Sequence, residues 1–465
     1  MEDALTTPLA VNRKKLIPWI NYLIFFCVVN ETVFNVSTPK ISEQFSLTPS
    51  SVSWMMTIFL VFFGIGSLIY GKLSDIYSPK VLLIIGIVIY NLGSVMGFAL
   101  KFSYPLVILS RAVQGIGASA LPALVFVVIA RYFEDHERGK VFGTITSTVS
   151  FGIGVGPVVG GVVSNSLHWS YLFLIPLFTL SAIPFVNKEL PAEPKRKGTV
   201  DILGAILVAL TVGTLVLFLN YSRWDYGITF IILLVLFLWR ILSADDPFIQ
   251  PDLFKNVRFR DGVLVGFSLF SIVMGIMFLI PLMLHEVHGL GTGKIGMILF
   301  PGAISSVFFG TYAGSLADRK GNSFVVAIGL ALLITSMILM AFFLSWSPTL
   351  IAFAMLLTYV GFSLFQTAMI NSVSQTLPEN ETGIGMGVFN LVAIISGAVG
   401  TAMVGKILDG KWLDFPVLST LSRGFAYGNL LLIFSLVAAA GGAFYLHAFR
   451  QKPDTKTSFA TDEHG

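Results

Sequence analysis

Long apolar runs separated by short polar segments follow one another along the whole chain. Each run is about 17 to 25 residues long, the length that an α-helix needs to cross the hydrocarbon core of a bilayer. The pattern predicts fourteen membrane-spanning helices. They lie near residues 17–38, 52–71, 81–100, 105–131, 141–164, 169–187, 201–219, 227–243, 261–284, 295–317, 323–345, 349–374, 384–406 and 426–447. The seventh and eighth runs are short and flank the polar segment SRWDYG, so twelve or thirteen spans remain alternatives.

Composition agrees with a membrane protein. Of the 465 residues, 55% are hydrophobic and only 12% are charged, against roughly 25% charged in soluble domains. The single cysteine, Cys27, lies in the first apolar run, which excludes an intramolecular disulfide. The N-terminal segment lacks the hydrophobic core of a signal peptide, so we expect a retained tail. We predict an all-α polytopic protein in a lipid bilayer, with no nucleic-acid partner.

Positive charges are distributed unevenly between the two sides of the predicted spans. With the N-terminus inside, 21 of the 29 Lys and Arg residues fall in inner segments, seven fall in outer segments, and Arg111 lies within a span. Cytoplasmic loops of membrane proteins carry an excess of Lys and Arg. We therefore expect both termini in the cytoplasm.

Two similar loops divide the chain into related halves. GKLSDIYSPK at 71–80 follows the second span, and GSLADRKGNS at 314–323 follows the tenth. Equivalent loops are expected in a parallel-repeat transporter, although a chance match of so short a pattern is the alternative. The predicted organisation is a six-helix bundle at 1–187, two additional helices with their loops at 188–259, a second six-helix bundle at 260–450 and a disordered tail at 451–465.

One acidic residue, Glu31, lies well inside the first apolar run. Burial disfavours the ionised form of a carboxyl group, so Glu31 can bind and release a proton near neutral pH, as a proton-coupled antiporter requires. The alternative is a static polar group bonded to Asn30, Asn35 or nearby backbone.

Arg111 lies in the fourth apolar run and needs a partner, because an arginine at bilayer depth costs about 2.5 to 3.5 kcal/mol on insertion scales. Glu31 is the expected companion, through a direct ion pair or through water and polar side chains. Arginine does not deprotonate in proteins, so Arg111 would tune a neighbouring acid rather than carry the proton. A helix-locking bond to backbone carbonyl groups is the alternative role.

Motifs in several spans resemble those of one transporter family. The loops at 71–80 and 314–323 resemble the signature loop of the major facilitator superfamily, and ILSRAVQGIGASA resembles its fourth-helix motif. FGIGVGPVVGG at 151–161 resembles the fifth-helix motif of antiporters, and NETVFNVSTPKI at 30–41 resembles the first-helix motif of the fourteen-helix drug/proton antiporter family. The tetracycline/proton antiporters of Gram-positive bacteria are the most similar group. The resemblance implies two six-helix bundles plus two extra helices in a bacterial cell membrane.

The fifth-helix segment has a face of small residues. Gly152, Gly156 and Gly160 recur four residues apart around Pro157. Such a face permits a kinked, close helix crossing that could seal a cavity toward one side. Simple packing is the alternative, and the resemblance favours a conformational role.

Asp75 and Asp318 lie at inner ends of predicted helices. The resemblance implies that Asp75 pairs with basic neighbours such as Arg138 or Lys140 in one conformation and releases them in another. The segment 71–80 lacks the arginine expected after the aspartate, so we expect a looser latch in the first half. Solvated loop residues are the alternative for both aspartates.

Polar side chains within the spans are candidates for lining a substrate cavity. They are Asn30, Asn35, Trp54, Gln114, Gln366, Asn371 and Asn390. Hydrogen bonding between helices is the alternative for each. The outer segment HEVHGLG, with two histidines, is too weak a signal to predict a metal site.

The chain departs from the tetracycline exporters at two membrane acids. Those exporters carry glutamates in the fifth and thirteenth helices, where this chain has Ile153 and Gly397. Fewer acids mean fewer protons or cationic groups handled in each cycle. We therefore expect a neutral or singly cationic amphipathic substrate rather than a metal complex of tetracycline.

The leading prediction is a monomeric exporter of small drugs or toxic metabolites, driven by inward proton flow and without any cofactor besides the proton. The sequence has no Gly-rich phosphate loop for ATP and no cluster of catalytic groups in the spans, so an enzyme is not expected. A proton-coupled importer of a small metabolite and a non-transporting membrane sensor are the alternatives.

Overall fold

The computed structural model describes residues 13–133, 135–195, 201–244, 247, 249–417 and 424–449. Fourteen segments of this part are long and apolar enough to cross a membrane, and the described residues contain no strand. The protein is therefore an all-helical, multi-pass membrane protein, as predicted. The N-terminal tail and the tail at 451–465 lie outside the described residues.

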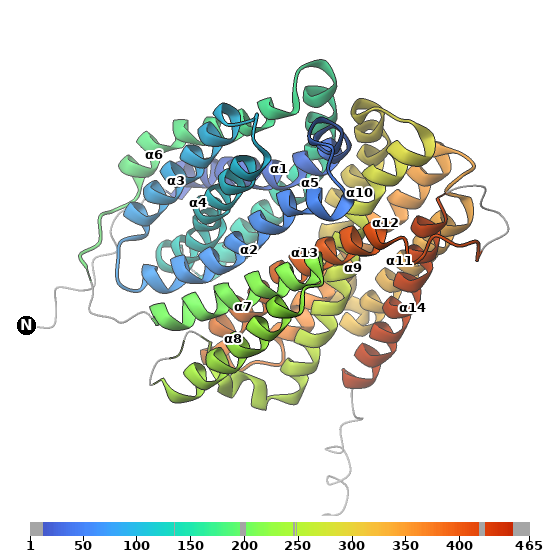
Figure 1. Ribbon diagram of the computed structural model, residues 1–465. Coiled ribbons are helices and arrows are strands. Elements are labelled where there is room, and N and C mark those ends of the chain that lie inside the picture. Colours follow the sequence, from blue (N-terminus) through green and yellow to red (C-terminus); the bar gives the residue numbers. More distant parts are fainter. Residues whose placement is uncertain are drawn as a thin grey trace, which may run out of the picture.

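The helices fall into three groups along the chain (Figure 1). The first group comprises α1 (Arg13–Phe45), α2 (Pro49–Ser74), α3 (Pro79–Ala99), α4 (Tyr104–Tyr132), α5 (Asp135–Ser166), η1 (Trp169–Ala182) and α6 (Ile183–Glu189). The middle group comprises α7 (Ile202–Tyr221), α8 (Trp224–Ser243) and the short η2 (Pro251–Lys255). The last group comprises α9 (Val257–His288), α10 (Thr292–Lys320), α11 (Asn322–Phe343), α12 (Pro348–Ser374), α13 (Glu379–Gly410) and α14 (Phe425–Ala448).

The first and last groups repeat one packing arrangement. In the first group α1 packs on α5, and α4 packs on both α2 and α3. The last group has the equivalent pairs eight helices later, namely α9 with α13 and α12 with both α10 and α11. The two groups contact each other through two helix pairs, α2 with α13 and α5 with α10. These pairs are equivalent, because α2 corresponds to α10 and α5 corresponds to α13 in the repeat. Two related bundles therefore enclose the centre of the molecule.

The middle pair packs on the outside of this arrangement. Helix α7 contacts α2 and α13, which belong to different halves, whereas α8 packs mainly on α7 (Figure 1). A tight turn separates them, with Ser222 in the left-handed region at φ 50°. The side chain of Asp201 caps α7 and forms an ion pair with Arg240 on α8, at 3.0 Å. Spans seven and eight are thus two separate helices.

Several helices are longer than the apolar runs that predicted them. Helix α1 has 33 residues and α9 has 32, because both continue past the apolar run into polar residues. The sixth span is interrupted differently: it begins as the 3-10 helix η1 and continues as α6. Proline at position 176 lies inside η1, where it cannot donate a backbone hydrogen bond.

The two halves pack closely at one end of the bundle, which we call the sealed end. There, a Cβ added at Gly405 of α13 would lie 2.9 Å from the backbone of Ser50 on α2. The backbone N–H of Ser50 also donates to Asp409 at 3.2 Å. On the other side of the interface, a Cβ added at Gly296 of α10 would lie 2.5 Å from the carbonyl oxygen of Pro157 on α5. Only glycine permits these close helix crossings.

The opposite end of the bundle, which we call the open end, is packed more loosely. Gly71 near the end of α2, Gly314 near the end of α10 and Gly387 near the start of α13 have no atom within 4 Å of an added Cβ. Unlike the glycines of the sealed end, these three make no close contact with the opposite half.

Candidate functional site

A central cavity of about 290 Å³ lies between the two halves. Its wall is made by α1, α2, α4 and α5 from the first half and by α9, α10, α12 and α13 from the second. Most of the lining is apolar, with many phenylalanine and methionine side chains. Phe126 and Asn390, which lie toward the open end, are exposed, so the cavity is accessible from that end.

Glu31 and Arg111 both line this cavity, on α1 and α4 respectively. They are its only charged lining residues within the described part of the chain. Within the described residues the structure contains no direct ion pair between them, because the guanidinium group of Arg111 is hydrogen-bonded to Met55 and Gln114 and not to Glu31. The sequence analysis expected either a direct ion pair or a link through water and polar side chains. The direct ion pair is absent from this conformation.

The guanidinium group of Arg111 is fully buried and held from three sides. Its Nε donates to the carbonyl oxygen of Met55 on α2 at 3.1 Å, and its Nη1 donates to Oε1 of Gln114 at 2.9 Å. The rings of Phe34 and Phe59 lie 4.5 and 4.1 Å from its central carbon. Cation–π contacts with two rings offset part of the cost of burying the charge. Arg111 thus also locks α4 to α2, which was the alternative role.

The predicted polar residues of α1 and α4 divide between the cavity and the interior of the bundle. Asn35 lines the cavity. Asn30 and Gln114 are fully buried behind it. The Nε2 of Gln114 donates to Ser94 on α3 at 2.8 Å, so Gln114 connects Arg111 to a third helix.

The candidates elsewhere are also divided. Gln366 and Asn390 line the cavity. Trp54 lies outside the cavity lining, because its ring packs against Tyr221 of the additional helix α7. Asn371 is also outside it, because its amide donates to Asn322 at the start of α11, at 2.9 Å. The sequence could not show that Trp54 and Asn371 lie outside the cavity, because a polar or aromatic residue in an apolar run does not reveal which face of the helix it occupies.

Ile153 and Gly397, which replace membrane acids of the tetracycline exporters, both line the cavity. The Cβ of a side chain added at Gly397 would lie 3.0 Å from Met274 and 3.4 Å from Leu60. Apolar residues from both halves therefore surround this position. The cavity wall is less acidic here than the resemblance alone would suggest.

The glycine face of α5 packs within the first half. An added Cβ at Gly156 would overlap Thr32 of α1, and one at Gly160 would overlap the carbonyl group of Val33. The contacts that seal the two halves are made instead by Pro157 and by the opposite face of α5, through Gly154 and Gly161. The glycines with the predicted four-residue spacing therefore pack α5 against α1. Gly154 and Gly161, which the sequence analysis did not single out, pack α5 against α10.

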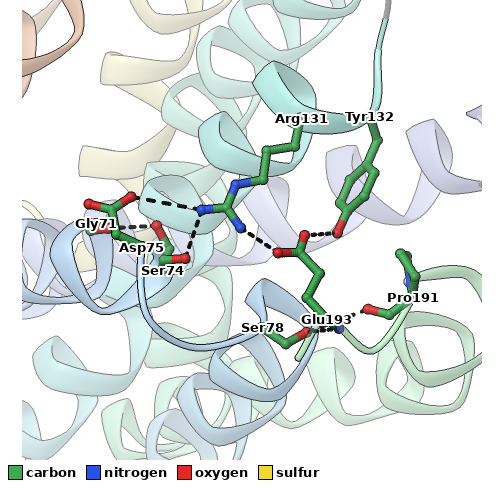
Figure 2. A network of polar contacts seen from close by, with 8 residues as sticks. All are labelled: Gly71, Ser74, Asp75, Ser78, Arg131, Tyr132, Pro191 and Glu193. Atoms are coloured by element: carbon green, nitrogen blue, oxygen red, sulfur yellow. Dashed lines mark hydrogen bonds and ion pairs between the residues drawn. The ribbon is translucent and has the colours of Figure 1, made fainter. Parts of the chain in front are cut away.

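Asp75 belongs to a polar network at the open end, shown in Figure 2. Arg131, at the end of α4, lies between Asp75 at 3.8 Å and Glu193 at 2.8 Å, and its Nη2 donates to the carbonyl oxygen of Ser74 at 2.7 Å. Glu193 also accepts a hydrogen bond from Tyr132. Among the side chains that the structure describes, the partner of Asp75 is Arg131. The sequence analysis missed Glu193, because nothing in a loop sequence shows where the loop packs.

Two predicted gating residues cannot be placed. The side chains of Arg138 and Asp318 lie outside the described part of the structure. At the sealed end, His285 on α9 pairs with Glu43 on α1 at 2.8 Å, and His288 bonds to the carbonyl oxygen of Leu344 at 2.6 Å. These histidines of the HEVHGLG segment therefore contact separate partners.

Two related helical bundles around a central cavity define the class: a transporter-like, multi-pass membrane protein. Residues 20–401 match the sequence profile of the Major Facilitator Superfamily. The chain belongs to this superfamily, whose members are membrane transporters.

Three bacterial relatives are each 26% identical to the chain over the aligned residues. The riboflavin transporter RibZ of Clostridioides difficile aligns over 82% of the chain and 84% of its own length. The lincomycin resistance protein LmrB of Listeria monocytogenes aligns over 83% and 84%, respectively. The methylenomycin A resistance protein of Bacillus subtilis aligns over 88% and 91%. Drug-resistance transporters are thus among the relatives.

Solved structures share the fold at lower sequence identity. A bacterial homologue of the human lysosomal transporter Spinster has a TM-score of 0.68 and 14% identity, and the match covers 95% of the chain and 98% of that structure. A POT family transporter has a TM-score of 0.69 and 14% identity, with 93% and 95% covered.

Proposed function

We propose that the protein is a proton-coupled antiporter that exports small amphipathic compounds from a bacterial cell by alternating access. One observation carries the proposal: Glu31 is the only carboxylate among the described residues that line the central cavity. An ionisable residue at membrane depth is expensive to retain and typically marks an ion or substrate pathway. The names of the lincomycin and methylenomycin A resistance relatives support export.

The proposed cycle uses the two ends of the bundle. The excess of positive charge on loops of the open end supports a cytoplasmic orientation for that end and for both termini. A substrate would enter from the cytoplasm and reach Glu31 in the cavity wall. The halves would then rock to open the sealed end, and Glu31 in the cavity would exchange the substrate for an external proton.

The cavity wall indicates the kind of compound. Methionine side chains from both halves, including Met56, Met274 and Met355, adapt to differently shaped apolar groups. Gln366 and Asn390 supply a few hydrogen-bonding groups. One carboxylate suits a neutral compound or a single cationic group.

A second candidate function is proton-coupled import of a small metabolite. The similarity to a riboflavin transporter favours it, because that relative is named for a vitamin rather than for resistance. The two functions differ in the direction in which substrate moves under a given proton gradient.

Reconstituted vesicles with an imposed pH gradient test the proposal. Lincomycin, riboflavin and tetracycline serve as probes, with the wild type, Glu31→Gln and the control Asp252→Asn, which changes an exposed surface acid. We expect a probe to move against the proton flow in the wild type and in the control, but not in Glu31→Gln. Movement with the proton flow would favour the importer, and gradient-driven transport that survives in Glu31→Gln would contradict coupling through Glu31.

A further inference from the structure

The hydroxyl group of Tyr359 on α12 has no hydrogen-bond partner within the described residues. The side chain lines the central cavity and is only 3% exposed. A buried tyrosine hydroxyl group usually has a partner, because its O–H has lost the hydrogen bonds that water would make. The oxygen is not enclosed by protein, in contrast to the unpartnered polar atoms of Asn30. The hydroxyl group therefore reaches the cavity, where a bound compound can meet it.

The other buried tyrosines of the second half have protein partners. The hydroxyl group of Tyr427 on α14 donates to Glu286 at 2.7 Å. The hydroxyl group of Tyr445, also on α14, is hydrogen-bonded to the hydroxyl group of Ser372 at 2.6 Å. Both tyrosines lie outside the cavity lining. Tyr359 differs from them because it faces the cavity rather than a polar group of a neighbouring helix.

The ring of Tyr359 is supported from behind by α10. A Cβ added at Gly302 of α10 would lie 2.7 Å from Cδ2 of Tyr359 and 2.9 Å from the carbonyl oxygen of Met355. One turn further along both helices, the hydroxyl group of Ser363 donates to the carbonyl oxygen of Ser306 at 3.2 Å. Close packing of α10 on α12 thus fixes the ring, so a bound compound would not have to order it.

An apolar wall surrounds the hydroxyl group of Tyr359. Met355, Tyr359 and Phe362 lie on one face of α12, four and three residues apart, and all three line the cavity. Phe362 meets Phe270 of α9 edge to face, with ring centroids 6.0 Å apart and an interplanar angle of 87°. Phe270 also lines the cavity, whereas the charged lining residues belong to the first half. The second-half wall is therefore uncharged and offers a phenolic O–H beside apolar side chains.

We propose that the hydroxyl group of Tyr359 donates a hydrogen bond to the transported compound, and that Tyr359 thereby selects compounds with a carbonyl acceptor next to an apolar group. This inference rests on the proposed function, because it takes the central cavity as the binding site of the transported compound. A phenolic O–H is satisfied as a donor only by an acceptor. A site with an unmet buried donor discriminates against compounds that lack the acceptor. Tyr359 is thus a specificity-determining residue on the half opposite Glu31.

Binding to the purified full chain in detergent, without a pH gradient, tests this role. The probes are riboflavin and lincomycin, which carry carbonyl acceptors, and tetraphenylphosphonium, which has apolar rings and a positive charge but no hydrogen-bonding group. We expect Tyr359→Phe to bind the carbonyl probes about tenfold more weakly than the wild type or worse, and tetraphenylphosphonium as the wild type does. Unchanged affinity for the carbonyl probes, equal weakening for all three probes, or failure of the wild type to bind either carbonyl probe would overturn the proposal.

The melting temperature without any probe separates a role in binding from a role in the fold. Tyr445→Phe is the matched control, because it removes a hydroxyl group that is bonded to Ser372 within the protein. We expect Tyr445→Phe to melt at a lower temperature than the wild type and to keep its affinity for the probes. Tyr359→Phe should melt at the wild-type temperature or above it, since its hydroxyl group has no protein partner to lose. A loss as large as that of Tyr445→Phe would overturn the proposal.

The inference and the proposed function fail in different measurements. Proton coupling plays no part in binding to the detergent-solubilised protein. If Glu31→Gln still couples in vesicles, the proposed coupling fails, whereas a weakened affinity of Tyr359→Phe for the carbonyl probes still supports the role of Tyr359. If Tyr359→Phe binds these probes as the wild type does, the role of Tyr359 fails and coupling through Glu31 is unaffected.

Discussion

Arg111 is placed so that a lysine could not replace it. A planar guanidinium group can stack between two rings and donate from several nitrogens at once, whereas an ammonium group is a point charge. Arg111 does both, with Phe34 and Phe59 on its faces and Met55 and Gln114 at its edge. Its charge is therefore held in one position relative to the cavity.

Gln114→Leu should destabilise the protein by about 1 to 3 kcal/mol, because it leaves Nη1 of the buried Arg111 without its acceptor and removes the hydrogen bond from Gln114 to Ser94. The measurement is the apparent melting temperature in detergent. Gln366→Leu is the matched control, since Gln366 lines the cavity and is only partly buried. Equal melting temperatures for Gln114→Leu and the wild type would contradict the role of Gln114.

His168 should make the sealed end less stable at acidic pH. Its Nδ1 accepts from the backbone N–H of Ser170 at 3.2 Å, which caps η1. Partial burial and the nearby Lys101 and Lys40 lower the pKa of His168 below its usual value. The folded protein therefore binds this proton less readily than the unfolded chain. Its contribution to stability is present at neutral pH and is lost as the pH falls below about 6.5.

The check is the melting temperature between about pH 7.5 and about pH 5, compared with His168→Asn. Asparagine can cap a helix and does not titrate in this range. We expect the variant to lose less stability on acidification than the wild type. An identical pH dependence would exclude His168 as the cause.

The key charges could be predicted from the sequence, but their relationship could not. Glu31 and Arg111 are conspicuous because ionisable residues are rare inside apolar runs. The sequence does not show that a direct ion pair is absent, nor that Asn30 is buried behind the cavity while Asn35 lines it. Both depend on the rotation of α1 against α4, which only tertiary packing determines.

Helix α5 contacts both halves and uses different small residues for each. Gly156 and Gly160 permit close packing on α1, whereas Gly154 and Gly161 meet α10. In the proposed cycle, an interface that moves and an interface that stays fixed thus share one helix. This division accounts for the density of glycine in the segment 151–161.

Gly160→Ala should lower the melting temperature, because its Cβ would overlap the backbone of Val33 on α1. Gly213→Ala is the control: nothing lies within 4 Å of an added Cβ on α7. There, alanine should be neutral or stabilising by up to about 1 kcal/mol through helix propensity. If the Gly160→Ala and Gly213→Ala variants had equal melting temperatures, α5 would not pack on α1 as described.

Glu193 should matter more for stability than Asp75. The carboxylate of Glu193 is only 7% exposed and bonds to Arg131 at 2.8 Å, whereas that of Asp75 is 74% exposed and lies at 3.8 Å. We expect Glu193→Gln to cost about 1 to 3 kcal/mol and Asp75→Asn less than about 1 kcal/mol. Thermal unfolding of both variants measures this, and limited proteolysis after Lys195 reports on the linker. The reverse order would show that Arg131 depends mainly on Asp75.

Helix number was predictable because apolar length is a strong signal, whereas helix ends were not. Polar residues continue α1 and α9 beyond the bilayer length, where hydropathy carries no information. The separation of α7 and α8 depends on a single turn at Ser222. The network around Arg131 depends on a linker whose packing is not encoded in any local pattern.

The whole molecule is closed at the sealed end and open at the other. A sequence cannot predict which end is closed, since in the proposed cycle the same chain adopts both states. What it did predict is the relation between the halves, through the similar loops at 71–80 and 314–323. The exchanged pairs α2 with α13 and α5 with α10 show this relation in three dimensions.

A disulfide across the sealed end should stop transport. A Cβ added at Gly293 of α10 would lie 3.4 Å from Cβ of Asn165 on α5, close to the separation of about 3.5 to 4.5 Å found in disulfides. The double variant Asn165→Cys with Gly293→Cys should cross-link under mild oxidation and regain transport on reduction. The native Cys27 is buried and should not interfere. Full transport by the cross-linked protein would contradict a rocking motion that opens this end.

Proton movement induced by substrate tests the proposed coupling most directly. Vesicles containing the protein and a trapped pH-sensitive dye, with no imposed gradient, receive an inward or outward gradient of lincomycin. We predict proton movement opposite to the drug in the wild type and in Asp252→Asn, and none in Glu31→Gln. Equal proton movement in Glu31→Gln, or drug movement in the wild type without any proton movement, would contradict the proposal that Glu31 couples the two.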